Sequence, residues 1–212
     1  MRSVYIHIPF CSSICSYCDF CKFLHDEIWA DEYLSHLEKE INKYYDNDEV
    51  RTIYIGGGTP SVLSMENLKK LFSIIKVFDV SKLEEFTFEM NVNDITEEKL
   101  SFLKENGVNR ISVGVESFNK INLKYLNRKH TKQEIINNIK LVKKYFENIN
   151  VDLMYALSIE KFSVLKSDVK EILKLGVPHI SAYSLILEPN TALFVNKVKP
   201  ISEDLDYKMY KY

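Results

Sequence analysis

Short β-rich runs alternate with amphipathic helical stretches along the whole chain, and this alternation limits the fold more than any other feature. Among the helical patterns are residues 31–45 and residues 131–145, the second opened by the capping-box pair Thr131 and Glu134. Strands and helices in this order form successive βαβ units around a parallel sheet. The sequence therefore predicts an α/β fold with six parallel strands. The strand-like runs cover residues 4–8, 52–55, 86–90, 110–113, 151–154 and 179–187.

The repeating units are not interrupted by a linker or a low-complexity tract, so we expect residues 1–212 to form one domain. The final stretch, ISEDLDYKMYKY, has the pattern of a helix start, with Ser202 as the cap and Glu203 and Asp204 in the first turn. This pattern stops after a few turns. We therefore expect that a further segment is missing from this sequence or was never encoded.

Charge and hydropathy exclude several kinds of partner. The chain has a formal charge of −2, and its lysines are interleaved with acids, which leaves no basic face to neutralise phosphates. A nucleic acid is therefore not an expected partner. The N-terminus lacks the apolar length of a signal peptide, and no stretch approaches the ~20 apolar residues that span a bilayer. The cytoplasm is the expected compartment, where clustered thiols indicate metal binding or catalysis more often than disulfides.

All four cysteines of the chain lie in one short loop. Structural thiols would be expected to scatter through a core of this size. Zinc is one alternative ligand, but structural zinc sites usually join two well-separated pairs of Cys or His, and a second pair is lacking. A compact run of thiolates suits an iron–sulfur cluster better, because neighbouring cysteines can bind different irons. We therefore favour an iron–sulfur cluster. The four residues are Cys11, Cys15, Cys18 and Cys21.

Polar and flexible residues occur at the ends of the predicted strands, where parallel α/β folds place their chemistry. The glycine run suits either a simple tight turn or close approach of the backbone to a phosphate, carboxylate or amine. Glu89, in an apolar strand, needs a partner for its charge. With the cysteine loop, these residues predict one site at this edge of the sheet. They are the glycine run 56–58, Glu89, Asn91, Glu116 and Asp152.

The cysteine loop resembles that of a known superfamily. Cys11, Cys15 and Cys18, with an aromatic residue just before the third, resemble the cluster loop of radical S-adenosylmethionine (SAM) enzymes. The flanking motifs are similar to those of oxygen-independent coproporphyrinogen III oxidase and its relative, the haem chaperone. This similarity runs from the first strand to about Thr191. The motifs are YIHIPFC, YIGGGTPS, NRISVGVESF, LNRKHT, VDLMYAL and HISAYSLILEPNT.

The resemblance implies a partial (β/α)6 radical SAM barrel with parallel strands and a 4Fe-4S cluster. In this family the three cysteines leave one iron open for the amino and carboxylate groups of SAM, and an electron from the cluster splits SAM. An electron donor protein is therefore an expected partner. The resemblance places tyrosines on the adenine side, the glycine run at the methionine amino end and Glu89 at the ribose. The SAM contacts that it implies are Tyr5, Tyr17, Gly57, Gly58, Thr59, Glu89, Glu116, Arg128 and Asp152.

Several positions depart from the family pattern. At position 116 a carboxylate replaces the family's amide, and it would repel the SAM carboxylate unless Arg128 compensates. We therefore expect reduced SAM affinity. The family also carries an accessory domain beyond the barrel, so residues 1–212 are expected to be a radical SAM core truncated before it. The departures are Glu116 for Gln, Val92 for Pro, Asn127 for Gly, and Ala156-Leu157-Ser158 for Gly-Leu-Pro.

Two function classes stay open, and no residue is assigned as catalytic. The enzyme class is oxidative decarboxylation of coproporphyrinogen III; the binding class is a haem chaperone that binds haem or a porphyrin and hands haem to an acceptor protein. The oxidase pattern places a fourth cysteine two residues after Cys18, whereas this chain has Phe20 there and Cys21 one residue later. That difference favours the chaperone. A truncated remnant that only binds a cluster is the third alternative.

Overall fold

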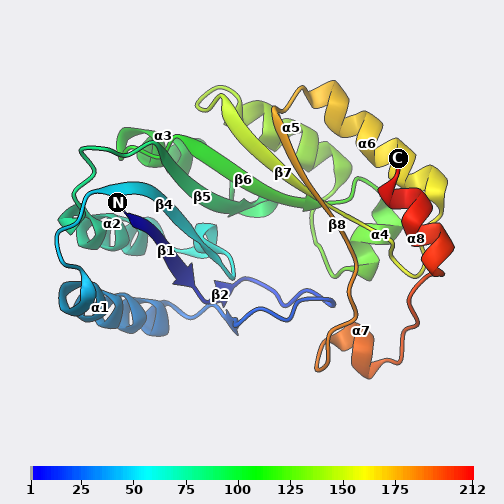
Figure 1. Cartoon of the computed structure of the whole chain (residues 1–212), viewed down its shortest axis with the longest axis horizontal. Helices are drawn as coiled ribbons and strands as arrows, with labels where there is room; N and C mark the ends of the chain where they lie inside the picture. The colour runs from blue at the N-terminus through cyan, green and yellow to red at the C-terminus, as the bar shows by residue number, and fades with distance from the viewer. Residues whose placement is uncertain (1) are drawn as a thin grey trace.

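Six parallel strands form one curved sheet in a computed structural model that describes residues 2–212 (Figure 1). The strands pair in the order β1-β4-β5-β6-β7-β8, so neighbours in the sheet follow one another along the chain. Every predicted run falls on one of these strands, and only the last differs appreciably, because β8 ends at Ser184 rather than at residue 187. The strands are β1 (Arg2–Ile8), β4 (Val50–Gly57), β5 (Glu85–Asn91), β6 (Arg110–Glu116), β7 (Asn148–Tyr155) and β8 (His179–Ser184).

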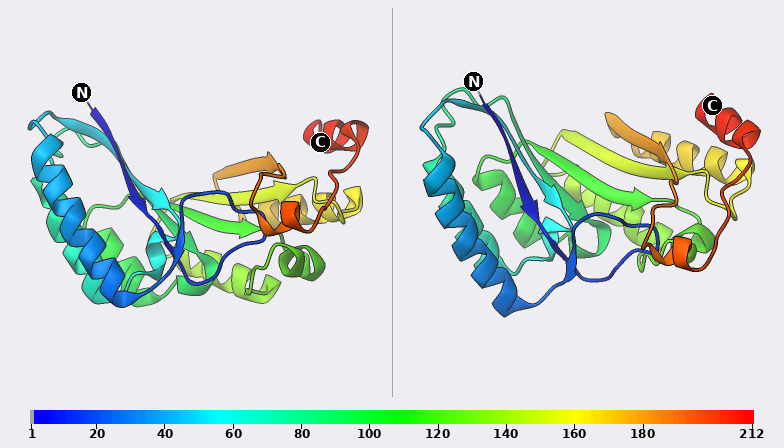
Figure 2. Two further views of the ribbon diagram at one scale, coloured as in Figure 1. Left: turned by 90° about the horizontal axis from the view of Figure 1, so that it is seen from below. Right: turned by 60° about the horizontal axis from the view of Figure 1, so that its bottom comes forward.

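Helices cover the outer, convex face of this curved sheet, as Figure 2 shows. The first helix begins at Glu27, earlier than its apolar pattern predicts, because the Asp26 side chain caps it by accepting from the Trp29 N–H. The Thr131–Glu134 capping box is present as predicted. The helices are α1 (Glu27–Tyr44), α2 (Met65–Ile74), α3 (Glu97–Glu105), α4 (Lys120–Tyr125), α5 (Lys132–Val142), α6 (Phe162–Leu175), α7 (Ala192–Val195) and α8 (Glu203–Tyr210), with short 3-10 turns at Pro60–Val62, Ile75–Val77 and Val92–Asp94.

The sheet is an open barrel. All of its pairings are parallel, and within residues 2–212 the first and last strands, β1 and β8, do not pair with each other. This is the partial (β/α)6 barrel that the sequence predicts, and the prediction of the fold class is confirmed.

Apolar and polar residues alternate along the strands, which gives the barrel a dry outer layer and a polar interior. In β5, Phe86 and Phe88 are buried in the core that the helices cover, while Thr87 and Glu89 point to the other face. Glu89 lies opposite Ser112 of β6 in the strand register. The parallel register therefore places polar side chains of successive strands side by side inside the barrel.

The C-terminal helix forms as its sequence predicts. Ser202 caps α8 by accepting from the Leu205 N–H, and Met209 is buried against the rest of the core. The ring of Tyr212 packs edge-on against Phe162 of α6, with 5.7 Å between their centroids. Across residues 2–212, none of the helices is both long and apolar enough to cross a membrane.

Candidate functional site

The cysteine loop is closed at its base by two very short strands. β2 (Phe10–Cys11) pairs in parallel with β3 (Phe23–Leu24). Two further backbone hydrogen bonds reinforce this closure, from Phe23 N to Pro9 O at 2.7 Å and from His25 N to Cys11 O at 2.9 Å. The loop therefore leaves the end of β1 as a closed unit, which the sequence pattern did not predict.

The far end of the cysteine loop is held from two sides. Ser16 donates its N–H to Leu126 O at 3.2 Å and accepts from Leu193 N at 3.0 Å. The Asn127 side chain donates to Ile14 O at 2.7 Å. Asn127 has a φ of 58°, a left-handed conformation that Asn tolerates better than most residues, so Asn can replace the family's Gly here. Figure 2 shows the loop reaching across the barrel toward α7.

A cavity of about 610 Å³ opens between the cysteine loop and the carboxyl ends of the strands. It brings together almost all of the residues that the sequence assigns to a cluster and to SAM. Those residues are Cys11, Cys15, Tyr17, Cys18, Gly57, Gly58, Thr59, Glu89, Glu116, Arg128 and Asp152.

Tyr5 is the predicted residue that is absent from the described cavity lining. It lies on β1 with 58% of its surface exposed. Its hydroxyl donates to His7 Nδ1 at 3.0 Å, and His7 in turn donates from Nε2 to Cys21 O at 2.8 Å. Tyr5 is thus linked to the cysteine loop through His7, and its contact with SAM remains a prediction.

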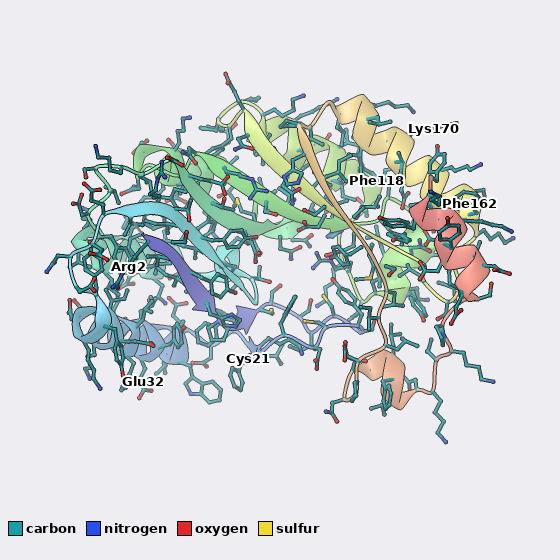
Figure 3. All side chains as sticks on the ribbon, viewed as in Figure 1. Arg2, Cys21, Glu32, Phe118, Phe162 and Lys170 are labelled. Carbon is teal, nitrogen blue, oxygen red and sulfur yellow. The ribbon has the colours of Figure 1, made fainter. Side chains whose placement is uncertain are left out.

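The cysteines fit a cluster better than a single metal ion. Cys11, Cys15 and Cys18 all line the cavity, whereas Cys21 is exposed and is not among its lining residues (Figure 3). In the described part of the chain, no three Cys, His, Asp or Glu side chains converge on a point where one metal ion could sit. Thiolates that bind separate irons of a cluster do not need to converge in that way. The arrangement of the three thiols is compatible with an iron–sulfur cluster.

Two side chains donate toward the cysteine sulfurs. Thr59 Oγ1 lies 3.4 Å from Cys11 Sγ, and Arg128 Nη1 lies 3.6 Å from Cys15 Sγ. Burial raises the pKa of the Cys11 and Cys18 thiols above its ordinary value and so favours their neutral form. A bound metal deprotonates its thiol ligands, and donors of this kind then stabilise the thiolate charge.

The glycine run is used within the fold rather than as an anion cradle. Gly57 N donates to Glu89 Oε2 at 3.1 Å, and Gly58 N donates to Ile8 O at 2.9 Å. Gly57 has a φ of 114°, and a Cβ on it would lie 2.5 Å from His7 Nδ1. A phosphate or carboxylate partner for these N–H groups is therefore disfavoured, and a ligand amine would have to meet carbonyl oxygens of the run.

Glu89 accepts hydrogen bonds from uncharged donors, whereas its position in an apolar strand suggested a charged partner. Its Oε1 accepts from Tyr54 Oη at 2.6 Å, and its Oε2 accepts from Gly57 N. Burial raises the pKa of Glu89 above its usual value, and these two hydrogen bonds oppose the rise. The carboxylate oxygens of Glu89, held in this way, can also accept hydrogen bonds from two neighbouring hydroxyl groups of a ligand.

Glu116 lies at the centre of a hydrogen-bond network. It ends β6 beyond a bulge, with a φ of 66° and 4% of its surface exposed. Its Oε1 accepts from Tyr17 Oη at 3.0 Å and from Arg128 Nη2 at 3.1 Å, and its Oε2 accepts from Tyr183 Oη at 2.6 Å. The predicted compensation of Glu116 by Arg128 is thus a direct ion pair.

Arg128 keeps a donor for a further partner. Its Nη2 also donates to Gly114 O at 2.6 Å, and Gly114 leaves room for it because a Cβ there would lie 2.5 Å from the same atom. Its Nε is buried and makes no hydrogen bond within residues 2–212. A buried N–H without an acceptor is costly, so the guanidinium suits an additional anionic group.

Asp152 is held by the polar interior of the barrel. Its Oδ1 accepts from Asn150 Nδ2 at 2.8 Å, and the same amide donates to Ser112 Oγ at 2.9 Å. Burial, followed by the charge of Glu116, raises the pKa of Asp152 to about 7. The acid can therefore be either neutral or charged near neutral pH.

Sequence reasoning missed two tyrosines of the site. Tyr183 lies in β8 and bonds to Glu116, and Tyr54 lies in β4 and bonds to Glu89. The alternation of residues along each strand could have placed Tyr54 beside Gly56 on the inner face, and Tyr183 beside Ser181. Their partners lie 35 and 67 residues away in the sequence, so no local pattern indicates the contacts.

Comparison with known proteins gives a consistent picture. The model of the Radical SAM superfamily matches residues 5–177. A protein named Heme chaperone HemW from Lactococcus lactis subsp. lactis is 44% identical, and the match covers 100% of this chain and 57% of that protein. The protein of the same name from Bacillus subtilis is 42% identical, and the match covers 92% of this chain and 53% of that protein. The Escherichia coli protein of that name is 36% identical, over 95% and 55%. The chain thus spans about half the length of these relatives.

Solved structures agree with the sequence matches. Coproporphyrinogen III oxidase (HemN) from Escherichia coli superimposes with a TM-score of 0.90 at 26% identity, over 99% of this chain and 50% of that one. Streptococcus suis SuiB bound to S-adenosylmethionine has the same fold at 14% identity, with a TM-score of 0.67 over 99% of this chain and 46% of its own.

Proposed function

The chain belongs to the radical SAM superfamily, and we propose that it is the cofactor-binding barrel of a haem chaperone. Membership of the superfamily implies a 4Fe-4S cluster and SAM as cofactors. Haem binding, its transfer to an acceptor protein, an electron donor protein and a cytoplasmic location belong to the proposal. The proposal also retains residues 1–212 as a single radical SAM core domain.

In this proposal Cys11, Cys15 and Cys18 hold the cluster. A bound cluster supplies an open iron that chelates SAM and an electron that reduces it. The protein's part is positional: Thr59 and Arg128 donate to two of the sulfurs, and the hydrogen bonds of Ser16 fix the loop over the barrel. The exposed thiol of Cys21 takes no part in ligation.

The remaining cavity residues bind and orient SAM. The buried Nε of Arg128 is the donor we assign to the SAM carboxylate, and Glu89 accepts from the ribose hydroxyls. Carbonyl oxygens of Gly57 and Gly58, with Thr59, meet the amino group. Tyr5 and Tyr17 lie toward the adenine. Glu116 and Asp152 complete the site, Glu116 by holding Arg128 and Tyr17 in place.

The observation that carries the chaperone proposal is Phe20. The oxidase pattern has a cysteine at this position, whereas here an aromatic side chain with 68% of its surface exposed lines the cavity. A phenyl ring supplies neither a thiol nor a proton donor for chemistry on a porphyrinogen. The relatives named as heme chaperones, at 36–44% identity, support the same proposal.

The second candidate function is oxidative decarboxylation of coproporphyrinogen III. The close superposition on the coproporphyrinogen III oxidase of Escherichia coli favours it. That similarity is weaker in sequence, at 26% identity, and the chain covers only half of that protein. A barrel that binds a cluster without either activity is the third alternative.

One experiment separates these functions. The reconstituted protein is incubated anaerobically with coproporphyrinogen III, SAM and reductant, protoporphyrinogen is assayed by chromatography, and haem is titrated separately by absorbance. We expect saturable haem uptake and no decarboxylated product. Formation of protoporphyrinogen would contradict the chaperone proposal. Absence of both activities with an intact cluster would leave only a cluster-binding function for these residues.

A further inference from the structure

A second hollow, of about 410 Å³, lies outside the barrel between α1 and the base of the cysteine loop. We call it the α1 groove, after the helix that forms one of its walls. Trp29 and Phe23 are 59% and 53% exposed, which is unusual for large aromatic side chains. Figure 3 shows Glu32 on the outer side of this helix. The residues that define the groove are Pro9, Phe10, Phe23, Trp29, Glu32, Tyr33 and His36.

Helical spacing produces the wall on α1. Trp29, Tyr33 and His36 are spaced four and three residues apart, so they lie on one face of the helix. The adjacent face, which includes Ala30, Leu34, Leu37 and Ile41, is buried in the core. Tyr33 is accounted for by the fold, because its hydroxyl donates to His7 O and its ring packs edge-on against Phe10. The side chains of Trp29 and His36 are exposed, although the solvent side of an amphipathic helix normally carries charged residues.

His36 is also the histidine whose ring is free to bind a ligand. Within residues 2–212 it makes no side-chain hydrogen bond, ion pair or ring contact, and it is exposed. A neutral imidazole with a free nitrogen is the commonest protein ligand of a transition metal.

The other four histidines are less accessible or already have partners. His7 uses both ring nitrogens, His179 Nδ1 accepts from Arg110 Nη2 at 2.9 Å, and His25 Nε2 is buried, 3.5 Å from Glu27 Oε2, without a hydrogen bond in the described residues. His130 is buried and donates to Val115 O at 3.1 Å.

We propose that the α1 groove binds haem, with His36 as an axial ligand of the iron and Trp29 and Phe23 flanking the macrocycle. The inference rests on the proposed haem chaperone function and assigns its site. A planar apolar macrocycle suits aromatic walls, and an axial His is a common iron ligand. The described groove lining contains the acid Glu32 and no Lys or Arg, so the propionates would extend away from Glu32 into solvent, on the side of Lys39 and Lys43, which follow His36 by one and two helical turns.

The openness of the groove suits transfer. A hollow of this size encloses only part of a tetrapyrrole, so one edge of the haem stays accessible to an acceptor protein. Phe10 and Phe23 belong to β2 and β3, which close the cysteine loop. Haem in the groove would therefore touch the segment that carries the cluster ligands.

The test is a haem titration of the reconstituted protein, in which the cluster occupies Cys11, Cys15 and Cys18. We expect the wild type to bind one haem with the absorbance and electron paramagnetic resonance signature of histidine ligation. H36A should lose that signature and bind about tenfold more weakly or worse, and added imidazole should restore the signature. W29A should weaken binding while the histidine signature remains. Y44A, at an exposed aromatic on the same helix but outside the groove, should match the wild type.

The outcomes separate this inference from the proposed function. If the wild type binds haem and H36A binds it with the same affinity and spectrum, the α1 groove is not the site, although the chaperone function stands. If the wild type binds no haem, the proposed function fails for this barrel and the inference fails with it. Circular dichroism of each variant checks the fold, which the exposed positions of His36 and Trp29 should leave intact.

Discussion

Tyr183 on β8 donates a 2.6 Å hydrogen bond to Glu116 on β6, across the strand β7 that lies between them. The other oxygen of the same carboxylate accepts from Tyr17 in the cysteine loop and from Arg128. One carboxylate thus connects the last strand of the sheet, the loop that carries the cysteines and the arginine assigned to SAM. The carboxylate is satisfied by the protein itself and does not need a donor from a ligand.

Replacing Glu116 with Gln should tighten SAM binding. The amide oxygen can still accept from Tyr17 and Arg128, and the amide nitrogen can donate to Tyr183 Oη, so the network can keep its geometry. The guanidinium loses a competing negative charge and becomes a better partner for the SAM carboxylate. We expect affinity to rise about tenfold, or roughly 1.4 kcal/mol, measured by calorimetry on the reconstituted protein.

The matched control for this variant is Y183F. It removes the hydrogen bond to Glu116 Oε2 and leaves the carboxylate charge in place. It should not tighten SAM binding. If E116Q binds SAM no better than the wild type, repulsion by the carboxylate does not limit the affinity.

Replacing Arg128 with Ala should destabilise the fold. Glu116 would keep its two tyrosine donors but lose its opposite charge in a buried position, and removal of one partner of a buried pair typically costs about 3–5 kcal/mol. The free energy of unfolding, from chemical denaturation, should fall by an amount in this range. R128A/E116Q removes the stranded charge and should recover a large part of the loss. A double variant no more stable than R128A would show that the unpaired charge is not the cause.

The sequence predicts the barrel well because its signal is repetitive. Each strand carries a β-rich run, and the capping residues Thr131 and Ser202 occupy their helix starts as predicted. Strand pairs two residues long have no periodicity to detect, which is why β2 and β3 were not foreseen. Their pairing depends on the closure of the whole cysteine loop and not on a local preference.

The cavity lining could largely be predicted from the sequence, but its hydrogen bonds could not. Of the residues that the resemblance to radical SAM enzymes assigns to the cluster and SAM, all but Tyr5 line one cavity, yet the resemblance does not indicate that Gly57 N is already used by Glu89. The left-handed backbone of Glu116 is likewise invisible in the sequence, because a non-glycine residue rarely adopts it. Tertiary context imposes both features.

Replacing any one of Cys11, Cys15 or Cys18 with Ala should abolish the cluster. Anaerobic reconstitution of the wild type should give a brown protein with about four iron and four sulfide per chain. C21A should retain both, because Cys21 is exposed and lies away from the cavity. Iron and sulfide analysis with absorbance spectra measures the outcome. A cluster that survives loss of one of the three but not loss of Cys21 would overturn the ligand assignment.

Replacing Asp152 with Asn should make the stability of the fold less dependent on pH. Burial and the nearby Glu116 raise the pKa of Asp152 from 3.8 to about 7, so the folded protein holds this proton more tightly than the unfolded chain does. The stabilisation from protonated Asp152 is therefore complete below about pH 4 and is lost as the pH rises toward 7. Each pKa unit of this difference corresponds to roughly 1.4 kcal/mol.

The Asn side chain stays neutral and can still accept from Asn150 while it donates to Ser112, so D152N avoids this loss. Urea denaturation at about pH 4 and about pH 8 should show D152N gaining stability relative to the wild type at the higher pH. The control is E38Q, at an exposed acid on α1. Its stability relative to the wild type should be nearly the same at the two pH values. If the stability of D152N relative to the wild type is the same at both pH values, Asp152 is not the group whose ionisation opposes folding in this range.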